Sequence, residues 1–241
     1  MVPAAPGEEV TSLLQRFHDA GSSVEADLLQ DGKTGSFLDQ QANHGAAHAY
    51  AAALLAGEGA QLALDAFTYH GGFALGLARA GLQVEALDES AAAIARARKN
   101  AQLSGVVVDF RVENAFTALR GLEAAGRRYQ VVVVDPPALA KRGRAGAGAA
   151  GREAMAAALR AYKELNLRAL RLLRPGGLLF TCSCSGRLSP QDFGGMLREA
   201  AADARREVQL LERRGAGLDH PVLLGLSETE YLKCWVLKAL G

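Results

Sequence analysis

The sequence predicts an α/β fold built on one doubly wound, mostly parallel sheet, and three observations predict it. Residues 131–134 are four consecutive valines, a pattern typical of a strand buried on both faces in the centre of a parallel sheet. From residue 62 onward, strand-like segments alternate with helical patterns, which favours parallel strands joined by helices. Residues 215–230 include Gly, Pro and polar residues and lack a helical pattern, so we expect the last two strands to form an antiparallel pair.

Size and composition limit the classes of protein. The 241 residues, 49% of them apolar, suffice for one substantial core, most simply one domain with a short appendage. The formal net charge of +1 provides no global field for nucleic acid but permits a locally basic face. Three cysteines form no disulfide framework, and no signal pattern or long apolar run is present. We therefore expect reduced thiols and a cytoplasmic protein with no membrane partner; the oligomeric state stays open.

The N-terminal residues 1–57 are predicted as a helix and strand extension, and residues 58–241 as the main domain. Val10, Leu13, Leu14 and Phe17 recur at helical spacing, which predicts a short helix over residues 8–20. The further elements expected in this extension are a strand over 24–29, a turn over 31–35, an extended piece over 37–39 and a helix over 45–55 that ends at Gly57.

In the main domain, the pattern predicts seven strands and five helices. The strands are expected at 62–67, 84–87, 106–112, 131–134, 178–182, 208–213 and 231–237. The helices are expected at 72–80, 90–103, 115–125, 152–173 and 190–205. Residues 143–151 lack an apolar period and are expected to form a loop beside Asp135.

Polar residues end the first three strands of this domain, where open α/β sheets bind their ligands. Gly71 and Gly72 stand where a helix begins, so backbone there could approach a ligand closely. Asp88 ends the second strand and is placed to accept hydrogen bonds from ribose hydroxyls, and Asn114 after the third could contact an adenine edge. A dinucleotide is disfavoured because the spacing is not G-x-G-x-x-G. A turn and a strand end with purely structural roles stay open for each feature alone.

A second group of residues lies at the ends of the fourth and fifth strands. Asp135 is followed by two prolines, which end the strand and place the acid at the sheet edge. Cys184 is expected in the loop after the fifth strand, where a thiolate could act as a nucleophile, whereas Cys182 is expected in the core. A zinc site is disfavoured because no second Cys or His cluster accompanies the two cysteines.

The order of these motifs resembles the class I S-adenosylmethionine-dependent methyltransferases, and more closely the bacterial 23S ribosomal RNA 5-methylcytosine methyltransferases of the large-subunit type I group. The resemblance covers roughly residues 24–241. The segments that carry it are GSFLDQ (35–40), FTYHGGF (67–73), DPP (135–137), SCSG (183–186), DHP (219–221) and YLK (231–233). It implies a Rossmann-like fold with a seven-stranded, mostly parallel sheet whose last strand is antiparallel.

The resemblance also implies S-adenosylmethionine as the methyl donor, an RNA substrate, which we expect to be 23S ribosomal RNA, no metal, and Cys184 as the nucleophile with Asp135 contacting the base. A thiolate added to C6 of a pyrimidine makes C5 able to attack a methyl group, and an acid near N3 stabilises the adduct. The cofactor-binding residues that it implies are Phe37, Asp39, Asp65, Phe67, Tyr69, Gly71, Gly72, Asp88, Glu89, Asn114, Ala115, Asp135 and Pro136.

Several features depart from the family pattern. Members carry an N-terminal RNA-binding module of the PUA type, for which these 241 residues have no room, and arginines where this chain has Gln41 and His44. Phe67 and Tyr69 stand where glycines are usual, and Asn114 replaces a more common acid. Lys141, Arg142, Arg144 and Arg152 flank the active edge and could hold RNA phosphates, or form a solvated loop. Methylation of another RNA base or a small molecule, and cofactor binding without catalysis, therefore stay open.

Overall fold

The computed structural model describes residues 13–29, 36–54, 61–139 and 149–240. A seven-stranded sheet has the order β5-β4-β3-β6-β7-β9-β8, and a separate hairpin is formed by β1 (Leu14–Asp19) and β2 (Ser22–Asp27). The strands of the sheet are β3 (Leu62–Asp65), β4 (Gln83–Asp88), β5 (Asp109–Val112), β6 (Tyr129–Val134), β7 (Leu173–Ser183), β8 (Val208–Arg214) and β9 (Lys233–Ala239). The first five are parallel, and β9 is antiparallel to both β7 and β8, as the sequence predicts.

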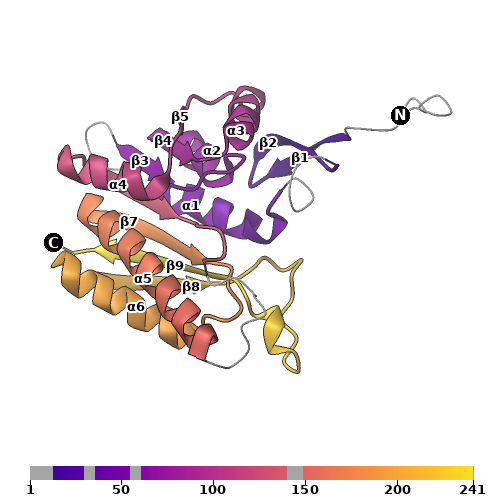
Figure 1. The fold of residues 1–241 in the computed structure, drawn as a ribbon. Helices are drawn as coiled ribbons and strands as arrows, with labels where there is room; N and C mark the ends of the chain where they lie inside the picture. Colours follow the sequence, from indigo (N-terminus) through magenta and orange to yellow (C-terminus); the bar gives the residue numbers. More distant parts are fainter. Residues whose placement is uncertain (1–12, 30–35, 55–60, 140–148, 241) are drawn as a thin grey trace.

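Helices cover both faces of this sheet (Figure 1). Val132 and Val134 of β6 pack in the core under α4, α5 and α6, whereas Val131 and Val133 pack in the core under α1, α2 and α3. The four valines are fully buried because successive side chains of a strand point to opposite faces. The helices are α1 (Gln41–Leu54), α2 (Gly72–Arg79), α3 (Ala91–Ser104), α4 (Ala115–Ala124), α5 (Ala149–Leu172) and α6 (Pro190–Ala204).

The predicted N-terminal helix is wrong, because part of it is strand β1 (Leu14–Asp19), which pairs with β2 (Ser22–Asp27). The two strands meet at Ala20 and Gly21, whose φ values of 47° and 85° match a type I′ hairpin turn. Phe17 pairs with Val24 across the hairpin. Because Phe17 also fits a helical spacing, the sequence pattern alone did not distinguish a strand from a helix here. The hairpin packs on α3, where the backbone N–H of Glu25 donates to Asn100 Oδ1 at 2.8 Å.

Other boundaries also differ from those expected. Residues 38–40 form a short 3₁₀ helix, η2 (Leu38–Gln40), instead of an extended piece, and residues 149–151 belong to α5 instead of a loop. The expected turn at 31–35, the helix end at Gly57 and most of the loop at 143–151 lie outside the described residues. The domain boundary between residues 57 and 58 stays a prediction for the same reason.

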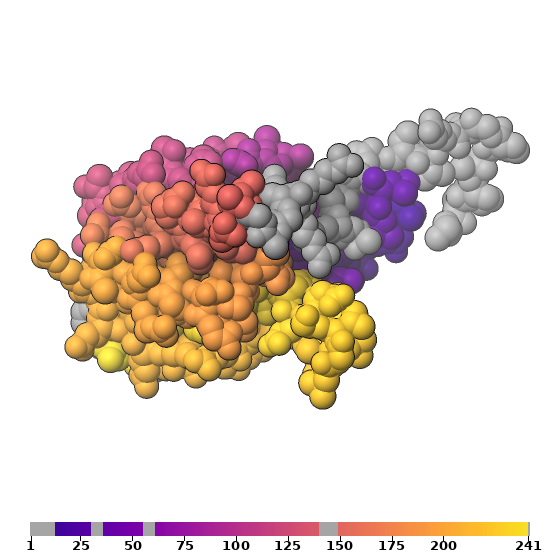
Figure 2. Space-filling view, turned by 60° about the horizontal axis from the view of Figure 1, so that its bottom comes forward, coloured from indigo at the N-terminus to yellow at the C-terminus, as the bar shows by residue number. Residues whose placement is uncertain are grey.

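Residues 215–230 connect β8 to β9 and contain the short 3₁₀ helix η3 (Ser227–Thr229). Figure 2 shows this segment, in golden yellow, standing out from the body of the molecule. Its apolar side chains include Leu218 and Leu224, both fully exposed. Within the described part of the chain, none of the helices combines the length and the apolar character needed to cross a membrane.

Candidate functional site

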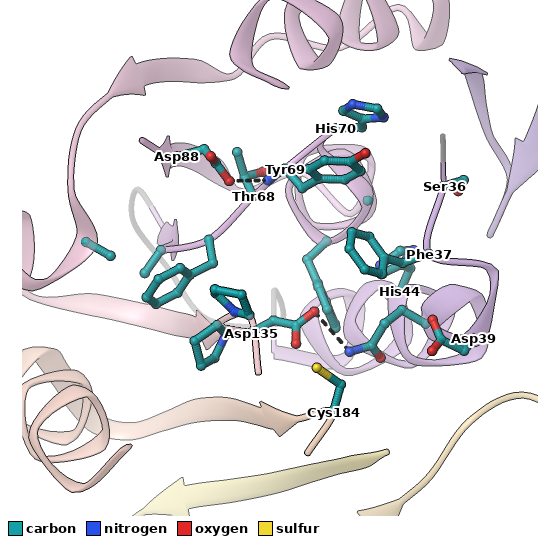
Figure 3. Close-up of a pocket in the computed structure, with 18 of the residues that line it drawn as sticks. Ser36, Phe37, Asp39, His44, Thr68, Tyr69, His70, Asp88, Asp135 and Cys184 are labelled. Carbon is teal, nitrogen blue, oxygen red and sulfur yellow. Dashed lines mark hydrogen bonds between the residues drawn. The ribbon is translucent and has the colours of Figure 1, made fainter. Parts of the chain in front are cut away.

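The ends of β3, β4 and β6 open into a cavity of about 600 Å³. Its walls come from three parts of the chain: the hairpin and η2, the loops after β3, β4, β5 and β6, and Cys184 with Leu232 (Figure 3). Of the predicted cofactor-binding residues, those that line this cavity are Phe37, Asp39, Phe67, Tyr69, Gly72, Asp88, Glu89, Asn114, Ala115, Asp135 and Pro136. Asp65 and Gly71 do not line it.

Asp65 acts from beneath the first loop. Its carboxylate, 1% exposed, accepts a hydrogen bond from the backbone N–H of Ala74 in the first turn of α2 at 3.1 Å. Burial raises the pKa of Asp65 to about 6, against the Thr68 hydroxyl, His44 and backbone N–H groups, which favour the ionised form. The geometry gives Asp65 a role in holding the loop on the helix.

The loop itself contains two residues with positive φ. Tyr69 has φ 48° and Gly71 has φ 96° at the N-cap of α2. Tyr69 occupies one of the positions where the family usually has glycine, and its backbone N–H donates to Asp88 Oδ2 at 3.0 Å (Figure 3). Its ring stacks on His70 and meets Phe37 edge-on, with centroids 4.9 Å apart. A left-handed backbone conformation is costly for a tyrosine, and in this loop it occurs together with the ring contacts to His70 and Phe37.

Asp88 ends β4 with both oxygens oriented. Oδ2 accepts from Tyr69 and Oδ1 accepts from the backbone N–H of Ser90 at 2.9 Å. A carboxylate has about four acceptor positions, so lone pairs remain for ligand hydroxyls facing the cavity. Asn114 is more fully occupied: Oδ1 caps α4 and Nδ2 donates to Glu89 at 3.2 Å.

Asp135 lies at the floor of the cavity, where Gln40 Nε2 donates to its Oδ2 at 2.9 Å (Figure 3). The donor is fixed by a chain of side-chain hydrogen bonds: Asn43 Nδ2 donates to Gln40 Oε1 at 2.6 Å, and Arg214 Nε donates to Asn43 Oδ1 at 2.9 Å. Burial and the carboxylates of Asp65 and Asp39 raise the pKa of Asp135 to about 7, although His44 and Gln40 oppose this shift. The carboxyl group can therefore hold or release a proton near neutral pH.

Gln40, Asn43 and His44 were given no site role from the sequence. Their spacing places them on one face of the helical segment, and all three are buried. His44 Nδ1 lies 2.7 Å from Asp19 Oδ2, and its ring packs edge-on against Phe73. Three polar residues on an otherwise apolar buried face were the signal that could have revealed them.

Cys184 follows β7 directly and is partly exposed, with its sulfur facing Asp135 (Figure 3). Cys182 is in the core, as expected, opposite Cys234 in the register of β7 and β9. Beside Cys184, Ser183 Oγ donates to the Tyr162 hydroxyl at 3.0 Å. In the segment before β9, the Tyr231 hydroxyl donates to Asp39 Oδ2 at 2.6 Å. Thiol and carboxyl thus share one side of the cavity.

The charge of the cavity lining is one-sided. Seven acidic side chains line it, and its described lining residues include no Lys or Arg; the acids are Asp19, Glu25, Asp39, Asp88, Glu89, Glu113 and Asp135. Arg16, Arg96 and Lys99 pair with Glu25, and the pKa of Asp135 is about 7, so the negative charge comes mainly from the other five acids. Phosphate groups need cationic or backbone donors, so this lining disfavours a nucleotide di- or triphosphate. It favours a ligand with positive charge and hydroxyl groups. Lys141, Arg142 and Arg144 lie outside the described residues, and Arg152 is exposed on α5.

The strand order, with a final antiparallel strand inserted beside β7, is the fold of the Rossmann-like methyltransferases. A solved structure of SMU.776, assigned as a methyltransferase and complexed with SAH, matches 98% of this chain and 58% of that chain at a TM-score of 0.76 and 18% identity. A SAM-dependent methyltransferase from Agrobacterium tumefaciens matches 98% of this chain and 72% of that one at a TM-score of 0.67 and 21% identity. The predicted fold is confirmed.

In sequence, the chain is similar to ribosomal RNA large subunit methyltransferase I of Shewanella denitrificans, with 36% identity over 221 residues. The match covers 90% of this chain and 52% of that relative, and the chain spans a little over half the length of the curated relatives it matches. This similarity in sequence confirms the resemblance to the large-subunit type I ribosomal RNA methyltransferases that the motifs indicate. No family model matches the chain.

Proposed function

We propose that this protein is an S-adenosylmethionine-dependent methyltransferase that acts on ribosomal RNA and forms 5-methylcytosine through Cys184. The observation that carries the proposal is the acidic cavity with a thiol and a carboxyl group on one side. The similarity to ribosomal RNA large subunit methyltransferase I supports the substrate class.

The cavity suits S-adenosylmethionine in charge and shape. The sulfonium and ammonium groups of S-adenosylmethionine carry positive charge, which the acidic side chains of the lining attract. Asp88 offers free lone pairs to ribose hydroxyls, and the side chains of Phe37, Phe67 and Phe116 give an apolar wall for a purine ring. When bound, this cofactor supplies a methyl group bonded to a positively charged sulfur.

Cys184 and Asp135 divide the work on the base. The Cys184 thiolate adds to C6 of the cytosine, which moves electron density onto C5 and N3, so that C5 can attack the methyl group. Asp135 in its protonated form donates to N3 as negative charge develops there, and a pKa of about 7 keeps this form populated near neutral pH. Removal of the C5 proton by a base then expels the thiolate and restores the ring double bond.

The decisive experiment traps the covalent step. Ribosomal RNA that contains 5-fluorocytosine is incubated with the protein and S-adenosylmethionine, because a C5–F bond blocks release after methyl transfer. We expect a protein–RNA adduct that survives denaturation, and its absence with Cys184→Ala. Methylation of unmodified RNA at the wild-type rate by Cys184→Ala would contradict the covalent mechanism, and an RNA without new 5-methylcytosine by mass spectrometry would contradict the reaction.

Cofactor binding is tested separately by calorimetric titration with S-adenosylmethionine. We expect a dissociation constant near micromolar, about −8 kcal/mol. Asp88→Ala should weaken binding by about tenfold or more, since a hydrogen bond to a charged group is worth about 1.5–3 kcal/mol. Matched affinity in this variant would remove Asp88 from the proposed contacts.

A further inference from the structure

Lys233 is a buried lysine beside the Cys184 loop. It begins β9 opposite Ser183 of β7 and is 4% exposed. Its Nζ donates three hydrogen bonds, to the carbonyl oxygens of Ser185 at 2.6 Å, Leu188 at 2.8 Å and Tyr231 at 2.9 Å. An ammonium group has three protons, so this cage uses all of them. Lys233 therefore links the segment that follows Cys184 to the start of β9.

The cage satisfies the hydrogen bonds of Lys233 but not its charge. The three acceptors are neutral carbonyl groups, and the ion pairs found among the described residues include none with Lys233. A buried charge is costly unless an opposite charge lies close by. Burial lowers the pKa of Lys233, and negative charge at Cys184 and Glu230 acts in the opposite direction.

This interaction is reciprocal. If a Cys184 thiolate stabilises the Lys233 ammonium, the ammonium stabilises the thiolate by the same free energy. Three further titratable groups in the described part of the chain lie near Cys184, and each is an acid or a phenol. They are Asp135 after β6, Tyr162 of α5 and Tyr231 before β9, with Asp39 bound to the Tyr231 hydroxyl. The negative charge of an ionised Asp135 would destabilise a Cys184 thiolate, and the positive charge of Lys233 would offset this repulsion.

We propose that Lys233 is a positioning residue for Cys184, because its ammonium holds the loop through Ser185 and Leu188 and favours the ionised thiol that the reaction needs. This inference rests on the proposed role of Cys184 as nucleophile. Lys233, the lysine of the YLK segment, would thus contribute to the reaction without touching a reacting atom.

The test is the pH dependence of Cys184 alkylation by iodoacetamide, without RNA or cofactor, followed by mass spectrometry of the peptide that contains Cys184. Cys182 and Cys234 are fully buried and serve as internal references. In the wild type we expect the midpoint of the profile below the value of about 8.5 of a free cysteine. A wild-type midpoint at or above this value overturns the inference, and this measurement needs no variant to fold.

Three variants separate charge from packing. Lys233→Met keeps a side chain of similar length, and its midpoint should rise by about one unit, or about tenfold less thiolate at neutral pH. Lys233→Arg keeps the charge and should stay near the wild type, and Lys238→Met on the same strand, at a partly exposed position, should leave the profile unchanged. Equal midpoints for the wild type and a folded Lys233→Met overturn the inference.

The same measurements distinguish failure of this inference from failure of the proposed function. A Lys233→Met variant with lost methyl transfer but the wild-type alkylation profile would show a purely structural lysine, and would leave Cys184 as nucleophile untouched. A raised midpoint in Lys233→Met together with full methyl transfer by Cys184→Ala would establish the charge coupling and refute the nucleophile.

Discussion

Gly72, at the start of α2, faces the His44 ring across a gap that no side chain could share. A Cβ atom at this glycine would lie 2.2 Å from His44 Cε1, 2.5 Å from Nε2 and 2.7 Å from Nδ1. The backbone of Gly72 is helical and does not need a positive φ. Replacement by alanine therefore acts through the clash alone: the ring must leave its position between Asp19 and Phe73.

The cost of Gly72→Ala follows from what the ring would lose. Forcing one methyl group into a packed core costs about 1–3 kcal/mol. Displacement also breaks the hydrogen bond with Asp19, whose carboxylate is 5% exposed and would be left without this partner, at about 1–3 kcal/mol. Partial relaxation makes these two costs overlap, so we expect the free energy of unfolding to fall by about 2–4 kcal/mol.

Urea unfolding measures this change, with Gly121→Ala as the matched control. Gly121 lies within α4 with open space around it, so alanine there should stabilise the protein by about 0.5–1 kcal/mol. The same Gly72→Ala change made in a His44→Ala background should cost little, because the clashing ring is gone. An equal cost in both backgrounds, or a Gly72→Ala protein as stable as the wild type, would refute the steric reasoning.

Three further predictions concern the floor of the cavity and the residue that precedes Cys184. Gln40→Leu removes a hydrogen-bond donor that lowers the pKa of Asp135. The pH above which the rate of methyl transfer falls should therefore rise by about 0.7 unit. An unchanged pH–rate profile would exclude this hydrogen bond from the reaction. Asp135→Asn should gain stability over the wild type as pH rises from 4 to 8, because the folded-state pKa of about 7 exceeds the ordinary aspartate value of 3.8 and ionisation destabilises the fold. A difference of about 3 pKa units corresponds to about 4 kcal/mol at pH 8 in urea unfolding, and a difference independent of pH would contradict this linkage. Ser183→Ala removes the bond to the Tyr162 hydroxyl and should cost about 1–2 kcal/mol in thermal unfolding while leaving Cys184 in place; an unchanged melting temperature would mean that this buried bond contributes nothing net.

The sheet could be predicted because its signals are local. Four valines, a strand–helix rhythm and polar strand ends each depend on a few neighbouring residues. The hairpin β1–β2 could not, since Phe17 fits a helix period as well as it fits a strand partner, and the choice depends on contact with α3, far along the chain. The positive φ of Ala20 was equally hidden, because alanine does not signal a left-handed turn.

The sequence could place those candidate site residues whose position at the end of a strand decides where they lie. Asp88, Asp135 and Cys184 follow strand ends and do face one cavity. Asp65 also ends a strand, but its buried carboxylate accepts a hydrogen bond from the backbone N–H of Ala74 beneath the loop and does not face the cavity. The hydrogen-bond chain from Arg214 to Gln40 joins segments 171 residues apart, a distance at which local pattern carries no information.

The position of β9 bears on how the molecule is made. This strand comes last among the seven along the chain, yet it lies between β7 and β8, and it carries Lys233. During synthesis, β7 must wait with one edge unpaired until residues 233–239 emerge, and an unpaired strand edge invites aggregation. A nascent chain or one truncated before Lys233 would also lack the cage behind the thiol. Assembly of the sheet and activation of Cys184 would then be one event, so an unfinished polypeptide would carry a quiescent cysteine.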